Sequence, residues 1–303
     1  MSKRKQYLIL IHLVIIIWGY TGIMGKTITL SSSVLVWYRL LIAFISLGLF
    51  IWLLKRPTVK ISRTDLWKII GVGAVVGLHW FTFFESIKMS SVSLGIICLS
   101  TTTLHVSWLE PLMRKRKVSF VEVLLGVIIV FGISFILNVE FEHINAILVG
   151  LSSAFFAALF SVSNSVLVDK VPSSQLSFIE LISGFVVLSV ILFFQGEMTQ
   201  DLFNISASNI GNLLFLGIVC TSLAFIIAVD ATKYLGAFTV SLSINLEPIY
   251  TMIMAVLLFP LEETMQFSFY IGSAIILAAV FFNGFWQYYA NRAHRMKESL
   301  VNQ

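Results

Sequence analysis

Long apolar runs follow one another along the chain, separated by short polar segments. A helix needs about 20 apolar residues to cross a bilayer core of about 30 Å. Continuous runs favour helices over membrane strands, in which apolar and polar residues would alternate. The pattern therefore predicts an all-α integral membrane protein with ten transmembrane helices, at residues 7–24, 34–54, 69–87, 92–112, 120–138, 146–168, 176–195, 210–230, 237–259 and 267–289.

The first run follows three basic residues and so resembles a signal peptide. Its apolar stretch is longer than the usual signal core, and no A-x-A type of cleavage site follows it. We therefore expect 7–24 to be a retained helix.

Composition supports a membrane protein, because 58% of the residues are hydrophobic and 12% are charged. Soluble domains carry roughly a quarter of charged residues. Cys98 and Cys220 both lie in apolar runs, so they predict neither a disulfide framework nor a CxxC metal pair. The net charge of +5 comes from dispersed basic clusters rather than from one basic face, which argues against nucleic-acid binding. We expect no cofactor, and the sequence leaves a homodimer open.

The basic residues predict the orientation, because lysine and arginine are retained on the cytoplasmic side of short loops. With the N-terminus inside, cytoplasmic segments hold 17 of the 20 basic residues: Lys3, Arg4, Lys5, Lys55, Arg56, Lys60, Arg63, Lys68, Arg114, Lys115, Arg116, Lys117, Lys170, Lys233, Arg292, Arg295 and Lys297. We expect a multi-pass protein of the cell (cytoplasmic or inner) membrane with both termini in the cytoplasm, ending in a basic tail at 290–303.

Two halves of five helices each, at 1–138 and 146–289, would insert with opposite orientation. An offset of 145 residues pairs the turn Glu85–Lys88 with the turn Asp230–Lys233, and Thr101–Thr103 with Leu246–Pro248. Matching Leu109–Pro111 to Leu246–Pro248 instead would pair a helix end with a helix centre, so we treat that match as coincidence. The sequence thus predicts an inverted repeat.

The chain resembles the drug/metabolite transporter (DMT) superfamily, in its ten-helix class built from two EamA-type repeats. The resemblance rests on Trp18-Gly19 with Gly25-Lys26, on Trp37-Tyr38-Arg39, on the turns ending in Lys88 and Lys233, and on Glu247-Pro248 with Glu262-Glu263. The first half departs from the pattern, with Thr103 at the usual proline and four basic residues after it. The resemblance implies helices around a central cavity, with 120–138 and 267–289 set aside, and secondary transport, as an exporter or permease of small metabolites.

Glu247 is the first candidate for a substrate or proton site, because ionisable residues inside a membrane are costly and face a cavity or a partner. Pro248 follows it and frees a backbone carbonyl in the preceding turn. The alternative is a protonated glutamate that holds neighbouring helices together. The inverted repeat would place Glu247 opposite Thr101, Thr102 and Thr103.

Arg39 and Glu180 occupy matching places near the starts of their helices. They could act as gates or bind a charged group of the substrate. The alternative is that each side chain extends to the nearby membrane interface. His79 and His105 could relay protons or bind substrate, or simply hydrogen-bond a carbonyl. Trp18 and Tyr20 belong to a set of aromatic residues that would line a cavity or pack against lipid.

Two other classes of protein remain open at this stage. An intramembrane enzyme would need a motif such as HExxH or a nucleophile with its base, and the sequence contains none. A channel or a non-transporting scaffold also fits ten helices. The substrate class remains open among amino acids, sugar-like metabolites, nucleobases and amphipathic drugs.

Overall fold

The computed structural model describes residues 2–25, 28–90, 92–137, 144–258 and 267–301, and its regular elements are all helical. The prediction of an all-α fold is therefore confirmed. The helices are α1 Lys3–Gly25, α2 Ser32–Leu53, α3 Arg63–Met89, α4 Val92–Ser100, α5 Thr102–Met113, α6 Phe120–Leu137, α7 Ile144–Leu167, α8 Ser173–Gln195, the 3-10 turn η1 Gln200–Phe203, α9 Ala207–Gly217, the π-helical η2 Ile218–Leu223, α10 Ala224–Leu235, α11 Ala237–Ile244, α12 Glu247–Leu258 and α13 Phe267–Val301.

Serine caps mark several helix starts. The hydroxyls of Ser31, Ser62 and Ser206 each accept a hydrogen bond from the backbone amide three residues on, which satisfies one of the free donors at the start of α2, α3 and α9. Gly196 ends α8 with φ of 72°, a left-handed conformation that glycine adopts without strain.

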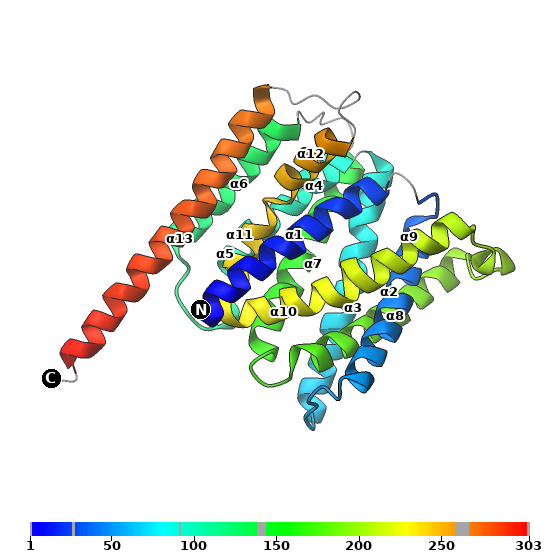
Figure 1. Ribbon diagram of the computed structural model, residues 1–303, viewed down its shortest axis with the longest axis horizontal. Helices are drawn as coiled ribbons and strands as arrows, with labels where there is room; N and C mark the ends of the chain where they lie inside the picture. Colours follow the sequence, from blue (N-terminus) through cyan, green and yellow to red (C-terminus); the bar gives the residue numbers. More distant parts are fainter. Residues whose placement is uncertain (1, 26–27, 91, 138–143, 259–266, 302–303) are drawn as a thin grey trace.

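The helices run between two faces of the molecule (Figure 1). On the face where α1 begins, Lys170 pairs with Asp65 at 3.1 Å and joins the end of α7 to the start of α3. On the opposite face, the Glu197 carboxylate accepts hydrogen bonds from Ser31 and Ser33 at the start of α2. The first is called the N-terminal face below.

Five helical stretches are long and apolar enough to cross a membrane: Ser32–Leu53, Arg63–Met89, Ile144–Leu167, Ser173–Gln195 and Ala207–Leu235. Shorter apolar stretches lie in α6 and α13, at Phe120–Ser134 and Tyr270–Asn283. These helices make the chain a multi-pass membrane protein, and the full count of ten spans stays a prediction.

Two of the predicted helices are broken, which corrects the prediction of continuous helices at 92–112 and 237–259. The first breaks at Thr101 and the second at Asn245–Leu246. Both halves break at equivalent places, because Val92 and Ala237 begin their helices 145 residues apart, as do Thr102 and Glu247. This agrees with the predicted repeat register.

The second break has a local cause in Pro248, which has no amide hydrogen. A helix running through it would leave a carbonyl of the preceding turn without its donor. Starting α12 at Glu247 instead places Pro248 in the first turn, where a helix needs no such donor. The side chain of Pro248 itself lies outside the described residues.

Helices α3 and α8 approach each other closely at glycines. A Cβ added at Gly73 would lie 2.4 Å from the Glu180 carbonyl oxygen, and one at Gly77 would lie 3.0 Å from the Gly184 Cα. Small residues at such crossings allow backbones to touch, which is a common way to pack helices in membranes.

Helices α6 and α13 lie side by side along one edge of the molecule (Figure 1). Helix α13 continues to Val301, so the predicted tail begins as a continuation of this helix. The arrangement agrees with a central bundle that has one helix of each half set aside, although Ile133 of α6 still reaches the cavity described next.

Candidate substrate cavity

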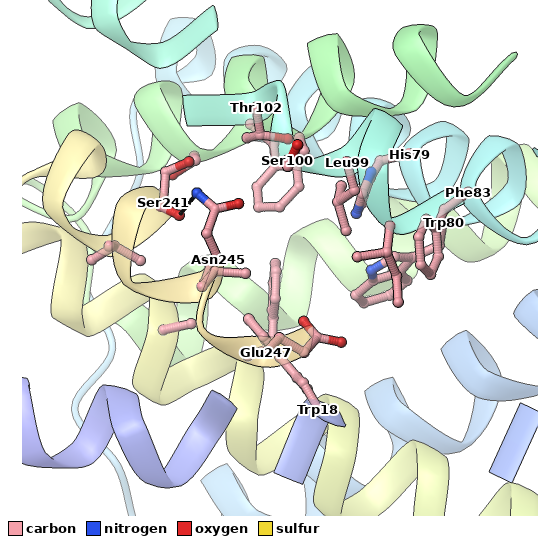
Figure 2. A pocket seen from close by; sticks show the side chains of 18 of the residues that line it. Trp18, His79, Trp80, Phe83, Leu99, Ser100, Thr102, Ser241, Asn245 and Glu247 are labelled. Carbon is pink, nitrogen blue, oxygen red and sulfur yellow. Dashed lines mark hydrogen bonds between the residues drawn. The ribbon is translucent and has the colours of Figure 1, made fainter. Parts of the chain in front are cut away.

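A cavity lies at the centre of the bundle, where the broken helices meet. It holds about 1150 Å³ of space not filled by protein atoms, part of which is open to solvent, enough for a small metabolite. Its lining comes from both halves of the chain: Trp18, Thr21, Arg39, His79, Trp80, Phe83, Ile96, Leu99, Ser100, Thr102, Ile133, Ala157, Phe160, Ser161, Asn164, Phe225, Ala228, Val229, Thr232, Val240, Ser241, Ile244, Asn245 and Glu247. Figure 2 draws 18 of these side chains around the open space and labels ten of them.

Arg39 is the fixed cation of the cavity. Its Nε donates a hydrogen bond of 2.6 Å to the Thr221 hydroxyl, and its guanidinium carbon lies 4.2 Å from the centre of the Trp80 ring. Arg39 is only 6% exposed, so it is held inside the protein and does not extend to the membrane interface. A hydrogen bond through Nε leaves the two terminal amino groups available to the cavity.

Glu247 is the first residue of α12, directly after the break (Figure 2). It lines the same cavity as Arg39, and the two groups attract each other electrostatically. A carboxylate in the first turn of a helix is also stabilised by the helix dipole. Burial opposes a negative charge on Glu247, and these two effects act against that cost.

A π-helical segment anchors both Arg39 and Trp18. Its Thr221 accepts from Arg39, and its Cys220 carbonyl accepts a 2.8 Å hydrogen bond from Trp18 Nε1. A π-helix shifts the regular hydrogen-bond pattern and frees backbone groups for such contacts, which is why π segments are frequent at functional sites. The segment Ile218–Leu223 thus fixes two walls of the cavity.

His79 lines the cavity from α3. Its Nδ1 lies 3.0 Å from the Ser153 carbonyl oxygen and 2.9 Å from the Ser153 hydroxyl. Because a carbonyl only accepts, we assign the ring hydrogen to Nδ1. This contact joins α3 to α7, and the rings of Phe83 and Phe160 flank the imidazole.

The three threonines at the first break have different places. Thr102 lines the cavity, whereas Thr103 lies buried behind it and accepts a 2.7 Å hydrogen bond from the Asn245 amide. Thr101 donates to the Cys98 carbonyl at the break and does not line the cavity. The two broken helices are therefore tied together through Thr103 and Asn245.

Three further predicted candidates, besides Thr101 and Thr103, lie away from the cavity lining. Tyr20 is 38% exposed and packs edge-on against Phe215, and His105 packs against Trp108 and Phe155. Glu180 is 0% exposed and accepts a 3.2 Å hydrogen bond from Asn164, which does line the cavity.

Sequence reasoning missed several polar members of the site. Asn164, Ser241 and Asn245 line the cavity, and Thr221 holds Arg39 from behind. The two asparagines had a usable signal, because an amide inside an apolar run also needs a hydrogen-bond partner. The cost of burying a charge, which points to Arg39 and Glu247, does not point to a neutral amide.

The fold and cavity define a class of protein, a helical membrane protein with a central cavity lined by both halves of the chain. Comparison then assigns the family: the chain belongs to the EamA-like transporter family, whose model matches residues 5–138 and 144–285. The resemblance to the DMT superfamily is thereby confirmed.

One curated relative is described as an uncharacterized transporter YxxF of Bacillus subtilis (strain 168), 24% identical over 256 residues that cover 82% of this chain and 80% of the relative. A solved structure described as "Crystal structure of protein" aligns with a TM-score of 0.73 at 12% identity. It covers 91% of this chain and 96% of the solved one, and at that identity it supports the fold alone.

Proposed function

We propose that the protein is a secondary transporter that binds a small organic solute in the central cavity and carries it across the membrane by alternating access. One observation carries this proposal. The guanidinium of Arg39 and the carboxylate of Glu247 line the same cavity. They do so where α5 and α12, the second segments of the two broken helices, begin. Broken helices around a site between two repeats are typical of secondary transporters.

The site favours an anionic group on the solute. Helices α5 and α12 start at the cavity with Thr102 and Glu247, so the positive ends of both helix dipoles are directed to it. The guanidinium of Arg39 adds a full charge and two terminal amino groups that suit a planar carboxylate. We therefore expect a carboxylate, or an anion of similar shape, to bind at Arg39.

The remaining lining suits the rest of such a solute. Glu247 offers a charge that a primary ammonium group could neutralise, while Asn245 and Ser241 offer hydrogen bonds. Trp80 and Phe225 supply apolar surface beside them. The proposed substrate is accordingly a small carboxylate-bearing solute with an apolar body, which Glu247 would favour further if it carries an ammonium group.

Alternating access requires contacts at the two faces to open in turn. At the N-terminal face, the Glu110 carboxylate accepts a 3.0 Å hydrogen bond from the Phe238 amide and so joins the end of α5 to the start of α11. At the opposite face, Tyr38 donates a 2.7 Å hydrogen bond to the Leu202 carbonyl. The helix breaks lie between these faces and would act as the hinges.

The test is counterflow in proteoliposomes. Vesicles loaded with unlabelled solute would be challenged with the same solute in labelled form, over a panel of amino acids, carboxylates, sugars and nucleobases. We expect saturable accumulation of carboxylate-bearing solutes, recovered chemically unchanged. Saturable counterflow distinguishes a transporter from a channel or scaffold, and unchanged solute distinguishes it from an enzyme.

Matched variants connect this transport to the cavity. Arg39→Gln should abolish counterflow, whereas Arg56→Gln should leave it intact. Arg56 also stacks on an aromatic ring, 4.9 Å from the centre of Phe50, but belongs to the polar segment after α2. Equal activity of the two variants would refute the assignment of the binding site, and absence of counterflow for the whole panel would refute this substrate class.

A further inference from the structure

Beside the cavity, three buried polar side chains form a second cluster. Asn164 of α7 and Ser177 and Glu180 of α8 are 1%, 0% and 0% exposed. The Asn164 amide donates to Glu180 Oε2 at 3.2 Å, and Ser177 lies one helical turn from Glu180 on the same side of α8. The close packing of Gly73 against the Glu180 backbone seals the cluster toward α3.

One oxygen of each side chain in this cluster has no hydrogen-bond partner among the residues the structure describes: Asn164 Oδ1, Ser177 Oγ and Glu180 Oε1. An ionised Glu180 would leave Oε1 as a buried acceptor without a donor, which is costly. A proton on Glu180 removes the negative charge and gives the carboxyl a hydrogen to donate.

No cation compensates a charge on Glu180 in the described part of the chain. Most ionisable groups on the other elements packed against α8 have partners elsewhere: Arg39 contacts Thr221 and Trp80, Asp65 pairs with Lys68 and Lys170, His79 bonds Ser153, Lys88 bonds the Leu30 carbonyl, and Asp230 bonds Tyr7. The others, Arg63, Glu85 and Lys233, lie near the ends of α3 and α10. Burying a carboxylate without such a partner costs several kcal/mol.

Glu247 differs from Glu180 in this respect, because Arg39 and the start of α12 both stabilise its negative charge. The two acidic residues therefore have different surroundings. Glu247 lines the cavity beside a cation, whereas Glu180 lies buried behind it without a cation in the described part of the chain.

We propose that Glu180, with Asn164 and Ser177, forms the proton-binding site that couples this transporter to a proton gradient. Asn164 lines the cavity and bonds Glu180 behind it, so its side chain separates the carboxyl from cavity water. Movement of Asn164 during the transport cycle would let the proton leave to the cavity. The coupling role rests on the proposed transport function, while the proton site itself can be observed without any substrate.

The test is infrared difference spectroscopy of the full-length protein in lipid vesicles, with pH as the only variable and no solute present. Wild type should show a carboxylic acid C=O band that disappears as the pH is raised. The band should be lost in Glu180→Gln and retained in Glu247→Gln. If Glu180→Gln does not fold, Asn164→Leu should shift the band, because it removes the amide that donates to Glu180.

Several results would overturn the proposal. They are a band that survives in Glu180→Gln, a band that Asn164→Leu leaves unshifted, and a Glu180 band that never responds to pH, which would mark a permanently neutral structural acid. A band that changes when sodium replaces choline at constant pH would identify a metal-cation site instead. Failure of the transport proposal would appear separately, as absent counterflow with an unchanged spectrum.

Discussion

The hydrogen bond between Arg39 and Thr221 gives a quantitative test of how the cavity is held together. Thr221→Val keeps the shape of the side chain but removes the hydroxyl that accepts from Arg39 Nε at 2.6 Å. The same hydroxyl donates to the Leu216 carbonyl at 2.7 Å. A buried hydrogen bond to a charged group contributes about 1.5–3 kcal/mol and a neutral one about 1 kcal/mol. We expect Thr221→Val to lower the free energy of unfolding by about 3 kcal/mol.

Thr232→Val is the matched control for this experiment. Thr232 lies on the same membrane-spanning stretch, is also buried, and also donates to a backbone carbonyl, that of Val229 at 2.7 Å. In the described part of the chain its hydroxyl bonds to this neutral carbonyl and not to a charged group, so the loss should stay at about 1 kcal/mol.

A double-mutant cycle with Arg39→Met isolates the pair. Unfolding of the single and double variants in lipid nanodiscs should give a coupling free energy of about 1.5–3 kcal/mol between positions 39 and 221. Additive effects of the two substitutions would show that the hydroxyl does not hold Arg39. That result would refute the account of the π segment as the support of the cavity.

Two further substitutions test the packing and the N-terminal face. Gly73→Ala should destabilise the protein by about 1–3 kcal/mol in thermal unfolding, because the new Cβ would lie 2.6 Å from the Glu180 Cα. Gly71→Ala is the control, because its Cβ would meet nothing within 4 Å, and it should be neutral or stabilising. Equal melting temperatures for the two would contradict the close approach of α3 and α8. Glu110→Ala should cost about 1–3 kcal/mol, since it leaves the buried Phe238 amide unpaired. Glu110→Gln keeps an acceptor for this amide and should recover at least half of the lost stability. If Glu110→Gln is as unstable as Glu110→Ala, the loss of stability comes from the lost charge instead.

Several features of this site could be predicted from the sequence because the membrane makes polar residues costly. That cost identified Arg39, His79 and Glu247, and the structure brings all three to one cavity. The repeat register placed Thr102 opposite Glu247, and both residues begin a half-helix at the cavity. Such predictions succeed when local composition alone determines which groups must avoid lipid.

Other features depend on contacts between distant segments, which periodicity does not report. The π segment is as apolar as its neighbours apart from Thr221 and Ser222, and its partners Trp18 and Arg39 lie about 180 or more positions earlier in the chain. The break at Thr101 has no proline or glycine to mark it. The sequence predicts Glu180 and Arg39 as equivalent residues, yet Arg39 lines the cavity and Glu180 lies behind it.

The central claim is that Arg39 recognises an anionic group on the transported solute. The most direct measurement compares counterflow of a carboxylic acid with that of its amide, which has nearly the same shape but no charge. Wild type should bind the acid about 10–100-fold more tightly than the amide, because a lost charge-assisted contact costs about 1.4–3 kcal/mol. Arg39→Gln should lose that preference. Equal transport of acid and amide by wild type, or an unchanged preference in Arg39→Gln, would contradict the account.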